Sequence, residues 1–368
     1  ICNDFTKYMT KNKFLAVGVM SGTSMDGIDI SLILSDGKKS YKHLKSKFYS
    51  YKKSTKTILS KLVDSFSVSK HSLALISSTE ELVTFEFITA LKNFLKDQSL
   101  SKIDLIALHG QTVFHDPINK SSIQLCDELK IKSSFKLPIV SDFRQKDLSL
   151  GGQGAPLTPI FHQLLTQKLE ITPPVCFVNI GGISNITVID DQKYIYAYDT
   201  GPGMCLLDQY MVLKKNINFD KGGKHSLKGK VNAKILKKLM SDKYFRKKKN
   251  KSLDRNYFSL NPFMKLNFND ACATISAFTA LTIIKEANRF NAKYLIVSGG
   301  GSKNKYVIKL MQETFRGKLS TADHLNLNSD FIESQAFAYL GIRRIKDLPI
   351  SFPSTTGVKY PVTGGKVN

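Results

Sequence analysis

The sequence predicts a mixed α/β fold that is built from two halves. Short apolar runs typical of buried strands alternate with stretches in which apolar residues recur at helical spacing. Each half opens with an apolar strand, a glycine turn and a second strand, at residues 14–34 and again at residues 175–189. At about 150 residues per domain, a chain of 368 residues corresponds to roughly two domains.

The remaining elements follow the same alternation. In the first half, strands are predicted at residues 14–19, 28–34, 103–108 and 137–141, and helices around 55–66 and 72–95. In the second half, strands are predicted at 175–180, 183–189 and 293–297, and helices at about 204–213, 231–240, 270–287, 303–315 and 331–346. Strands and helices in this order favour mixed sheets covered on both faces, with a ligand cleft where the halves meet.

Composition narrows the class of protein. The net charge of +24 would suit an anionic partner, but the lysines are spread along the whole chain, which favours a general compositional bias. The basic run at residues 246–251 has no interleaved aromatic residue, so we expect a solvated loop and no nucleic-acid partner. The uncharged stretch at 172–189 contains prolines and a glycine pair, so no membrane span is expected.

The cysteines argue against a disulfide framework. The chain has five of them, an odd number, and no two are spaced as a CxxC pair: Cys2, Cys126, Cys176, Cys205 and Cys272. We expect them to be small buried residues in a cytoplasmic protein.

Three glycine-rich loops each follow a predicted strand: GVMSGTSMDGID at 18–29, NIGGISNIT at 179–187 and SGGGSKN at 298–304. Small residues let backbone N–H groups approach a phosphate closely, and Asp26 and Asp29 could hold Mg²⁺. The spacing matches no standard phosphate-binding motif, and each loop alone could be an ordinary tight turn. Their repeated occurrence favours nucleotide binding.

Other polar residues stand at predicted strand ends and helix starts. Asp199 in AYDTGPGM is a candidate general base, with a helix cap or turn residue as the alternative. His109 and Gln111 in LHGQTVFH are candidate substrate contacts, although lone histidines are more often structural. Arg144 could bind a carboxylate or form a surface ion pair, and Glu333 could serve the site or the helix dipole.

Taken together, these strings resemble the anhydro-N-acetylmuramic acid kinases. In the family's order the chain carries GVMSGTSMDGID, LHGQTVFH, SDFRQKDLSLGGQGAPLTP, VNIGGISNITVI, YDTGPGMCLLD, KSLDRNYF, VSGGGSKN and ESQAFAYLG. The resemblance extends from about residue 17 to 367. It implies two actin-like, ribonuclease-H-like lobes of the sugar kinase/Hsp70/actin superfamily around a central cleft. We expect lobes at 1–142 and 143–350 and a tail, 351–368, that packs back on the first lobe.

The resemblance also implies an activity. Family members use ATP and Mg²⁺ to convert 1,6-anhydro-N-acetylmuramic acid to N-acetylmuramic acid 6-phosphate, opening the anhydro bridge, and a homodimer is expected. Asp199 matches the catalytic aspartate, and Arg144 and Glu333 match positions near the sugar. Residues 22–29 match the ATP-binding loop, which comprises Gly22, Thr23, Ser24, Met25, Asp26, Gly27, Ile28 and Asp29. The expected ATP contacts from the other two loops are Gly181, Gly182, Gly299, Gly300, Gly301 and Asn304.

Two alternatives stay open at this point. The first is a kinase for another anhydro sugar, such as levoglucosan, because no motif specifies the lactyl and acetamido contacts. The second is an actin- or Hsp70-like ATPase, or a nucleotide-binding module that acts through partners. The intact DTGPG string argues against the second alternative.

Overall fold

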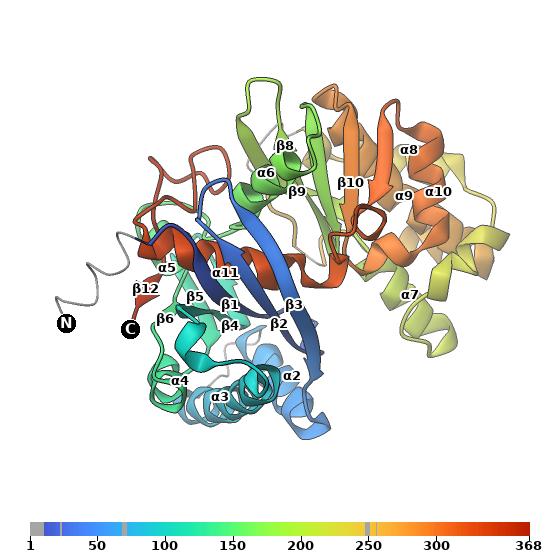
Figure 1. The fold of residues 1–368 in the computed structure, drawn as a ribbon. Coiled ribbons are helices and arrows are strands. Elements are labelled where there is room, and N and C mark those ends of the chain that lie inside the picture. The colour runs from blue at the N-terminus through green and yellow to red at the C-terminus, as the bar shows by residue number, and fades with distance from the viewer. Residues whose placement is uncertain (1–10, 23, 68–71, 247–250, 255) are drawn as a thin grey trace. The chain divides into compact units, whose positions relative to one another are not determined.

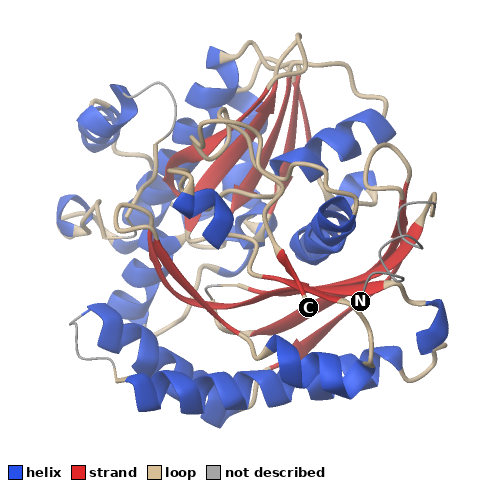
Figure 2. Ribbon diagram, turned by 90° about the vertical axis from the view of Figure 1, so that its left-hand side faces the viewer, coloured by secondary structure: helices blue, strands red, loops and turns tan. Residues whose placement is uncertain are grey.

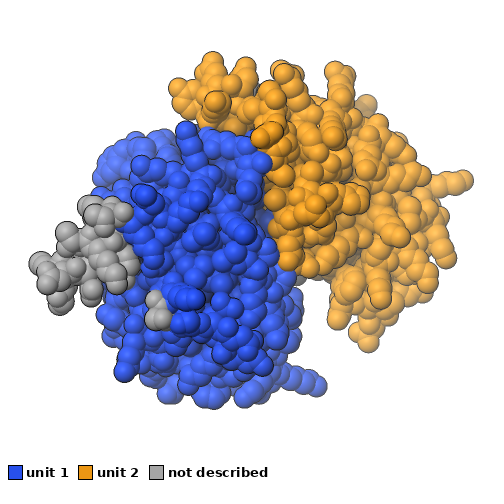
Figure 3. Space-filling model, viewed as in Figure 1, with its two compact units in different colours: residues 1–168, 331–368 blue, residues 169–330 orange. Residues whose placement is uncertain are grey.

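The computed structural model describes residues 11–22, 24–67, 72–246, 251–254 and 256–368, and divides the chain into two compact units. Unit 1 comprises residues 1–168 and 331–368, and unit 2 comprises residues 169–330 (Figure 3). These boundaries differ from the predicted ones at 142/143 and 350/351. The difference arises because helix α11 (Ile332–Ile345) packs on strands of unit 1.

Unit 1 contains a seven-stranded sheet in the order β12-β6-β4-β1-β2-β3, with β5 paired to β4 (Figure 1). Its strands are β1 (Phe14–Ser21), β2 (Gly27–Ser35), β3 (Tyr41–Ser50), β4 (Leu105–Asp116), β5 (Ser121–Leu125), β6 (Ile139–Ser141) and β12 (Lys366–Val367). Strands β1, β2 and β3 pair antiparallel, whereas β4 is parallel to both β1 and β6. The C-terminal tail joins this sheet because β12 pairs antiparallel with β6.

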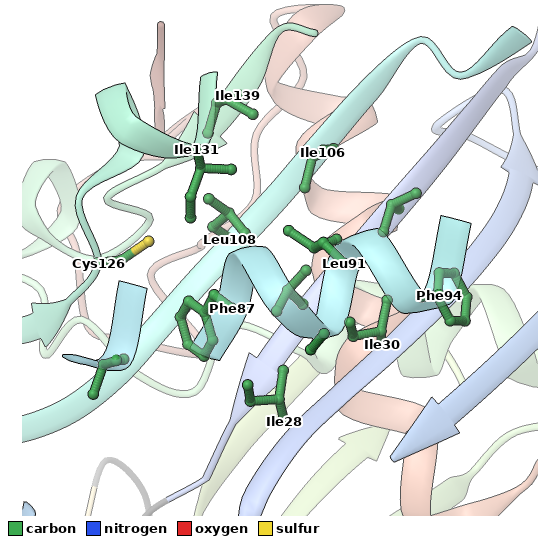
Figure 4. Close-up of a cluster of buried hydrophobic side chains, with 14 of the residues drawn as sticks. Ile28, Ile30, Phe87, Leu91, Phe94, Ile106, Leu108, Cys126, Ile131 and Ile139 are labelled. Atoms are coloured by element: carbon green, nitrogen blue, oxygen red, sulfur yellow. The ribbon is translucent and has the colours of Figure 1, made fainter. Parts of the chain in front are cut away.

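Helices cover both faces of the unit 1 sheet (Figure 2). They are α2 (Lys53–Ser67), α3 (Leu73–Leu95), α4 (Glu128–Phe135), α5 (Gln145–Ser149), α6 (Pro159–Lys168) and α11. The alternation of strand side chains sends Ile28 and Ile30 into an apolar core with Phe87 and Leu91 of α3 (Figure 4). Ser31, the residue after Ile30, faces α11, where its Oγ lies 2.7 Å from Ser334 Oγ.

Unit 2 contains a five-stranded sheet in the order β11-β10-β7-β8-β9. Its strands are β7 (Val175–Ile180), β8 (Ile183–Ile189), β9 (Ile195–Pro202), β10 (Tyr294–Ser298) and β11 (Lys318–Thr321). Its longer helices are α7 (Cys205–Lys215), α8 (Ala233–Met240), α9 (Phe268–Arg289) and α10 (Lys305–Thr314). Helix α9 is buried along most of its length, because it contributes to one apolar core with the sheet and to a second with α7.

The two sheets share one topology. In each, three consecutive antiparallel strands are followed by two parallel strands on the side of the first: β3-β2-β1-β4-β6 and β9-β8-β7-β10-β11. The α/β fold class with two like lobes is therefore confirmed. Four cysteines are free and buried, as predicted, while Cys2 lies outside the described residues. Among the helices described, none is long and apolar enough to cross a membrane.

Candidate active site

The first glycine-rich loop is the turn between β1 and β2 in unit 1. The two strands pair with Met20 opposite Asp29, and the turn closes where Met25 N–H donates to Gly22 O at 3.1 Å. Met25 adopts a left-handed φ of 56°. The predicted hairpin is therefore present. Thr23 lies outside the described residues.

Two carboxylates stand in this turn and the strand after it. Asp26 is exposed and Asp29 is half-buried, whereas Gly27 and Ile28 between them are buried. Among the described residues, no group of three or more His, Cys, Asp or Glu side chains could hold a metal ion. Mg²⁺ in kinase sites is commonly held by one or two carboxylates together with phosphate oxygens and water.

A buried polar network supports the turn from behind. Gln111 on β4 is fully buried, and its Nε2 donates to Gly22 O at 3.1 Å. Ser21 Oγ lies 2.6 Å from Gln111 Oε1 and accepts a 3.0 Å hydrogen bond from the Tyr51 hydroxyl. Both ends of the Gln111 amide are thus engaged within the protein. This geometry favours support of the turn over the predicted contact with substrate.

His109 and Arg144 form a second cluster in unit 1. The Arg144 guanidinium donates to His109 Nε2, at 3.1 Å from Nε and 2.9 Å from Nη2. His109 Nδ1 lies 2.8 Å from Gly110 O, a pure acceptor, so the imidazole carries its proton on Nδ1 and is neutral. Burial, with Arg144 adding to it, lowers the pKa of His109 well below its ordinary value. The predicted substrate contact His109 therefore orients Arg144.

Glu333 lies in the first turn of α11 and interacts electrostatically with Arg144. Burial raises the pKa of Glu333, and the Arg144 charge opposes that rise. Burial also lowers the pKa of Arg144 to about 10, opposed by Glu333. The structure thus brings three predicted residues of unit 1 together: His109, Arg144 and Glu333.

Sequence reasoning missed two residues near this cluster. His115 is exposed at the surface, but partial desolvation, to which the charge of Arg144 adds, lowers its pKa to about 4. Asp147 is fully buried, where it accepts hydrogen bonds from Gly154 N–H at 2.7 Å and the Thr356 hydroxyl at 2.6 Å. Asp147 therefore ties the glycine-rich loop that follows α5 to the C-terminal tail. Both residues lie in motifs that had already been singled out, His115 in LHGQTVFH and Asp147 in SDFRQKDLSLGGQGAP, and this position could have identified them from the sequence.

The other two glycine-rich loops lie at one edge of the unit 2 sheet, because β7 and β10 are parallel and end there. Gly299 has a left-handed φ of 81°, and a Cβ at this position would lie 2.1 Å from Asn179 Oδ1. A Cβ on Gly203 would lie 2.1 Å from Gly181 O. Glycine is therefore required at both positions for the close approach of the backbone. By contrast, Gly300 is exposed and open.

The remaining predicted ATP contacts of unit 2 have different surroundings. Gly181 and Gly182 accept hydrogen bonds from the backbone that leads into α7, and Gly301 is packed against Ile180. Asn304 is buried and caps α10, where its Oδ1 accepts from Tyr306 N–H at 3.1 Å. The side chain of Asn304 is thus used as a helix cap.

A row of polar residues crosses the unit 2 sheet next to these loops. In the strand register, Asp199 on β9 stands opposite Asn185 on β8, Asn185 opposite Asn179 on β7, and Asn179 beside Ser298 on β10. Residues that are paired in this way present their side chains on one face of a sheet. Asp199 therefore belongs to a strip of polar side chains that runs across the sheet.

Asp199 lies inside β9, and Met204 occupies the N-cap position of α7. The alternative reading of Asp199 as a cap or turn residue is therefore wrong. Its side chain is half-buried, and its Oδ2 accepts a 2.9 Å hydrogen bond from Leu253 N–H.

The surroundings of Asp199 set its basicity. Burial raises the pKa of Asp199 to about 6. Three smaller effects lower it: the hydrogen bonds from Leu253 N–H and the Ser252 hydroxyl, and the charge of Lys251. A carboxylate with this pKa is ionised at neutral pH and accepts a proton more readily than an ordinary aspartate.

Comparisons with known proteins agree over nearly the whole chain. A family model described as anhydro-N-acetylmuramic acid kinase matches residues 14–368. The kinase of that name from Zymomonas mobilis is 36% identical over 370 residues, covering 96% of this chain and 99% of the relative. Its counterpart from Methylobacterium nodulans is 36% identical over 367 residues, covering 95% and 98%. Among solved structures, component A of the (R)-2-hydroxyglutaryl-CoA dehydratase from Acidaminococcus fermentans matches with a TM-score of 0.47 and 10% identity, covering 89% of this chain and 99% of that one.

Proposed function

This chain belongs to the anhydro-N-acetylmuramic acid kinase family, and from that premise we propose that it uses ATP to convert 1,6-anhydro-N-acetylmuramic acid to N-acetylmuramic acid 6-phosphate. The observation that carries the mechanism is the half-buried Asp199 carboxylate, whose pKa is raised to about 6. Such a group suits the one proton transfer that this reaction requires.

The reaction couples hydrolysis to phosphoryl transfer. In the anhydro sugar O6 is bonded to C1, so there is no free 6-hydroxyl group to phosphorylate. A water oxygen forms a bond to C1 as the C1–O6 bond breaks, and Asp199 takes the proton of that water. The released O6 forms a bond to the γ-phosphorus of ATP, and ADP leaves. Asp199 is assigned the general base because it is an ionised, partly exposed carboxylate in unit 2.

The unit 1 cluster suits the binding of an anion. Arg144 hydrogen-bonds a neutral imidazole and interacts with Glu333 electrostatically, and its Nη1 makes no hydrogen bond within the described part of the chain. A guanidinium in this state can bind a carboxylate, and the lactyl group of the muramic sugar carries one. We assign Arg144 to that carboxylate and His109 to the orientation of Arg144.

The nucleotide is assigned to the three glycine-rich loops. The β1–β2 turn, supported by Gln111, would hold phosphates through backbone N–H groups, as would the loops after β7 and β10. Asp26 and Asp29 would hold Mg²⁺, which supplies charge neutralisation for the phosphates when it is bound. A homodimer in the cytoplasm remains part of the proposal.

The test is a coupled ADP-release assay with three sugars: 1,6-anhydro-N-acetylmuramic acid, levoglucosan and N-acetylmuramic acid. Mass spectrometry of the product formed in H₂¹⁸O should show one phosphate and one ¹⁸O at C1 when the anhydro-muramic sugar is supplied. Faster turnover of levoglucosan would identify the other anhydro-sugar kinase. Phosphate release without any phosphorylated sugar would identify an ATPase.

A further inference from the structure

Lys251 ends the basic run that the sequence predicts to be a solvated loop, yet its side chain is buried. Its ammonium donates a 2.6 Å hydrogen bond to Glu286 Oε1 on α9, and the two side chains are 0% and 1% exposed. The prediction is therefore wrong for Lys251, because its charge is neutralised inside unit 2. Residues 247–250 of the run lie outside the described residues.

The ion pair sits in a closed polar and aromatic environment. The Lys251 ammonium lies over the rings of Tyr244 and Tyr198, 5.0 and 5.3 Å from their centroids. The second oxygen of Glu286 accepts from the Tyr198 hydroxyl at 2.9 Å and from Arg289 Nη1 at 3.2 Å. Both carboxylate oxygens are thus engaged. Buried ion pairs usually add little stability relative to apolar residues, so this one calls for another explanation.

The backbone at Lys251 connects the ion pair directly to Asp199. Lys251 O accepts a 3.0 Å hydrogen bond from Asp199 N–H. The next two residues contact the carboxylate, Leu253 through its N–H at 2.9 Å and Ser252 through its hydroxyl. Tyr244, which covers the ammonium, also donates to Asp199 O at 2.8 Å. The segment 251–253 therefore lies along β9 beside the carboxylate.

We propose that Lys251 is a positioning residue: its buried ion pair with Glu286 fixes segment 251–253, whose donors hold the Asp199 carboxylate in the orientation that accepts a proton from water. The inference rests on the proposed function, since it takes Asp199 to be the base. Lys251 itself touches no reacting atom. Its effect is exerted through Ser252 and Leu253, which lose their fixed place when the anchor is removed.

The variant Lys251→Met keeps the length of the side chain and removes its charge. We expect kcat to fall about 10- to 100-fold, because small displacements of catalytic groups have effects of this size, while the Kd for ATP stays unchanged. The acid limb of the kcat profile should move to higher pH, because Lys251, Leu253 N–H and Ser252 all lower the pKa of Asp199. The titratable or charged groups around Asp199 and this ion pair are Tyr198, Tyr244, Glu286, Arg289, Lys285 and Cys176.

Two further variants keep the test decisive. Lys251→Met/Glu286→Gln removes both buried charges. Arg289, which loses its contact with the Glu286 carboxylate, is 29% exposed, so the double variant should fold and show the same loss of kcat. Lys309→Met removes one partner of the exposed Lys309–Glu313 pair in α10 and should leave kcat and its pH profile unchanged.

Two outcomes separate this inference from the proposed function. A double variant with a wild-type kcat and acid limb would overturn the positioning role even if its Tm fell. If Asp199→Asn abolishes turnover in that case, the assigned base stands and the positioning role alone fails. If Asp199→Asn retains wild-type turnover, the assigned base fails first.

Discussion

Each unit holds a cation among protein groups, and the two cations have different hydrogen-bond partners. In unit 1, the Arg144 guanidinium donates to the imidazole of His109, which is neutral. In unit 2, the Lys251 ammonium donates to the carboxylate of Glu286. Arg144 remains half-buried, whereas Lys251 is inaccessible.

The two cations differ in how far the protein neutralises their positive charge and occupies their hydrogen-bond donors. Arg144 hydrogen-bonds a neutral imidazole through Nε and Nη2, interacts with Glu333 electrostatically, and keeps an Nη1 that can donate to an anionic ligand. Glu286 cancels the charge of Lys251, so the pair acts inside the protein. A cation inside the protein therefore does not by itself identify a binding site. Lys251 is hydrogen-bonded to Glu286 and inaccessible, whereas Arg144 is half-buried and keeps a donor that is not used within the described residues.

The largest effect on stability should follow from Glu286→Gln. This variant leaves the Lys251 ammonium buried without its carboxylate, and breaking such pairs typically costs about 3–5 kcal/mol of the free energy of unfolding. Urea unfolding monitored by circular dichroism measures the loss. A change below about 0.5 kcal/mol, typical of surface substitutions, would show that the ammonium is not confined as described.

The next largest effect should follow from Arg144→Ala. We expect the KM for the anionic muramic sugar to rise about 10- to 100-fold, because a charged hydrogen bond is typically worth about 1.5–3 kcal/mol. The KM for neutral levoglucosan should rise less. Equal effects on both sugars would show that Arg144 does not bind the lactyl carboxylate.

A smaller effect should follow from His109→Gln, which offers the guanidinium another neutral acceptor. The KM for the muramic sugar should rise by no more than about tenfold, or about 1.4 kcal/mol. Because the pKa of His109 is lowered well below its ordinary value, the imidazole stays neutral as the pH falls, so the wild-type KM should not change between about pH 5 and pH 8. A step in KM near pH 6.5 would show that His109 titrates.

Apolar patterning in the sequence predicted most of the core elements but not the edge strands. Strands β1, β2, β7, β8 and β10 are apolar runs that end in glycine or polar residues. Strand β3 was missed because it is an edge strand in which exposed residues, among them Lys42, Leu44 and Lys47, are interspersed with buried and half-buried ones, so it has no apolar run. Short strands such as β11 give too few residues for a periodic signal.

For the candidate site, sequence motifs located individual residues but not the partners that they contact. Motifs marked Asp199, Arg144 and Glu333, but the partners that set their roles come from tertiary structure. Gln111 supports the first turn because the β1–β4 register puts it opposite Ser21. Lys251 appeared solvated because its partner Glu286 is 35 residues away in sequence, on another element. Local composition contains no information on such contacts.

The most direct test of the account is Asp199→Asn, which keeps the shape of the side chain and removes its basicity. We expect kcat to fall about 10²–10⁴-fold while the Kd for ATP is retained. The wild-type kcat should decline as the pH falls through about 6, where Asp199 takes up a proton. The pKa of Asp199 is higher in the folded protein than in the unfolded chain. Above about pH 6 the carboxylate is ionised in both states, and its burial then destabilises the folded one. Asp199→Asn removes this cost and should therefore not lower the Tm at pH 8. A folded, ATP-binding Asp199→Asn enzyme with near wild-type kcat would contradict the account.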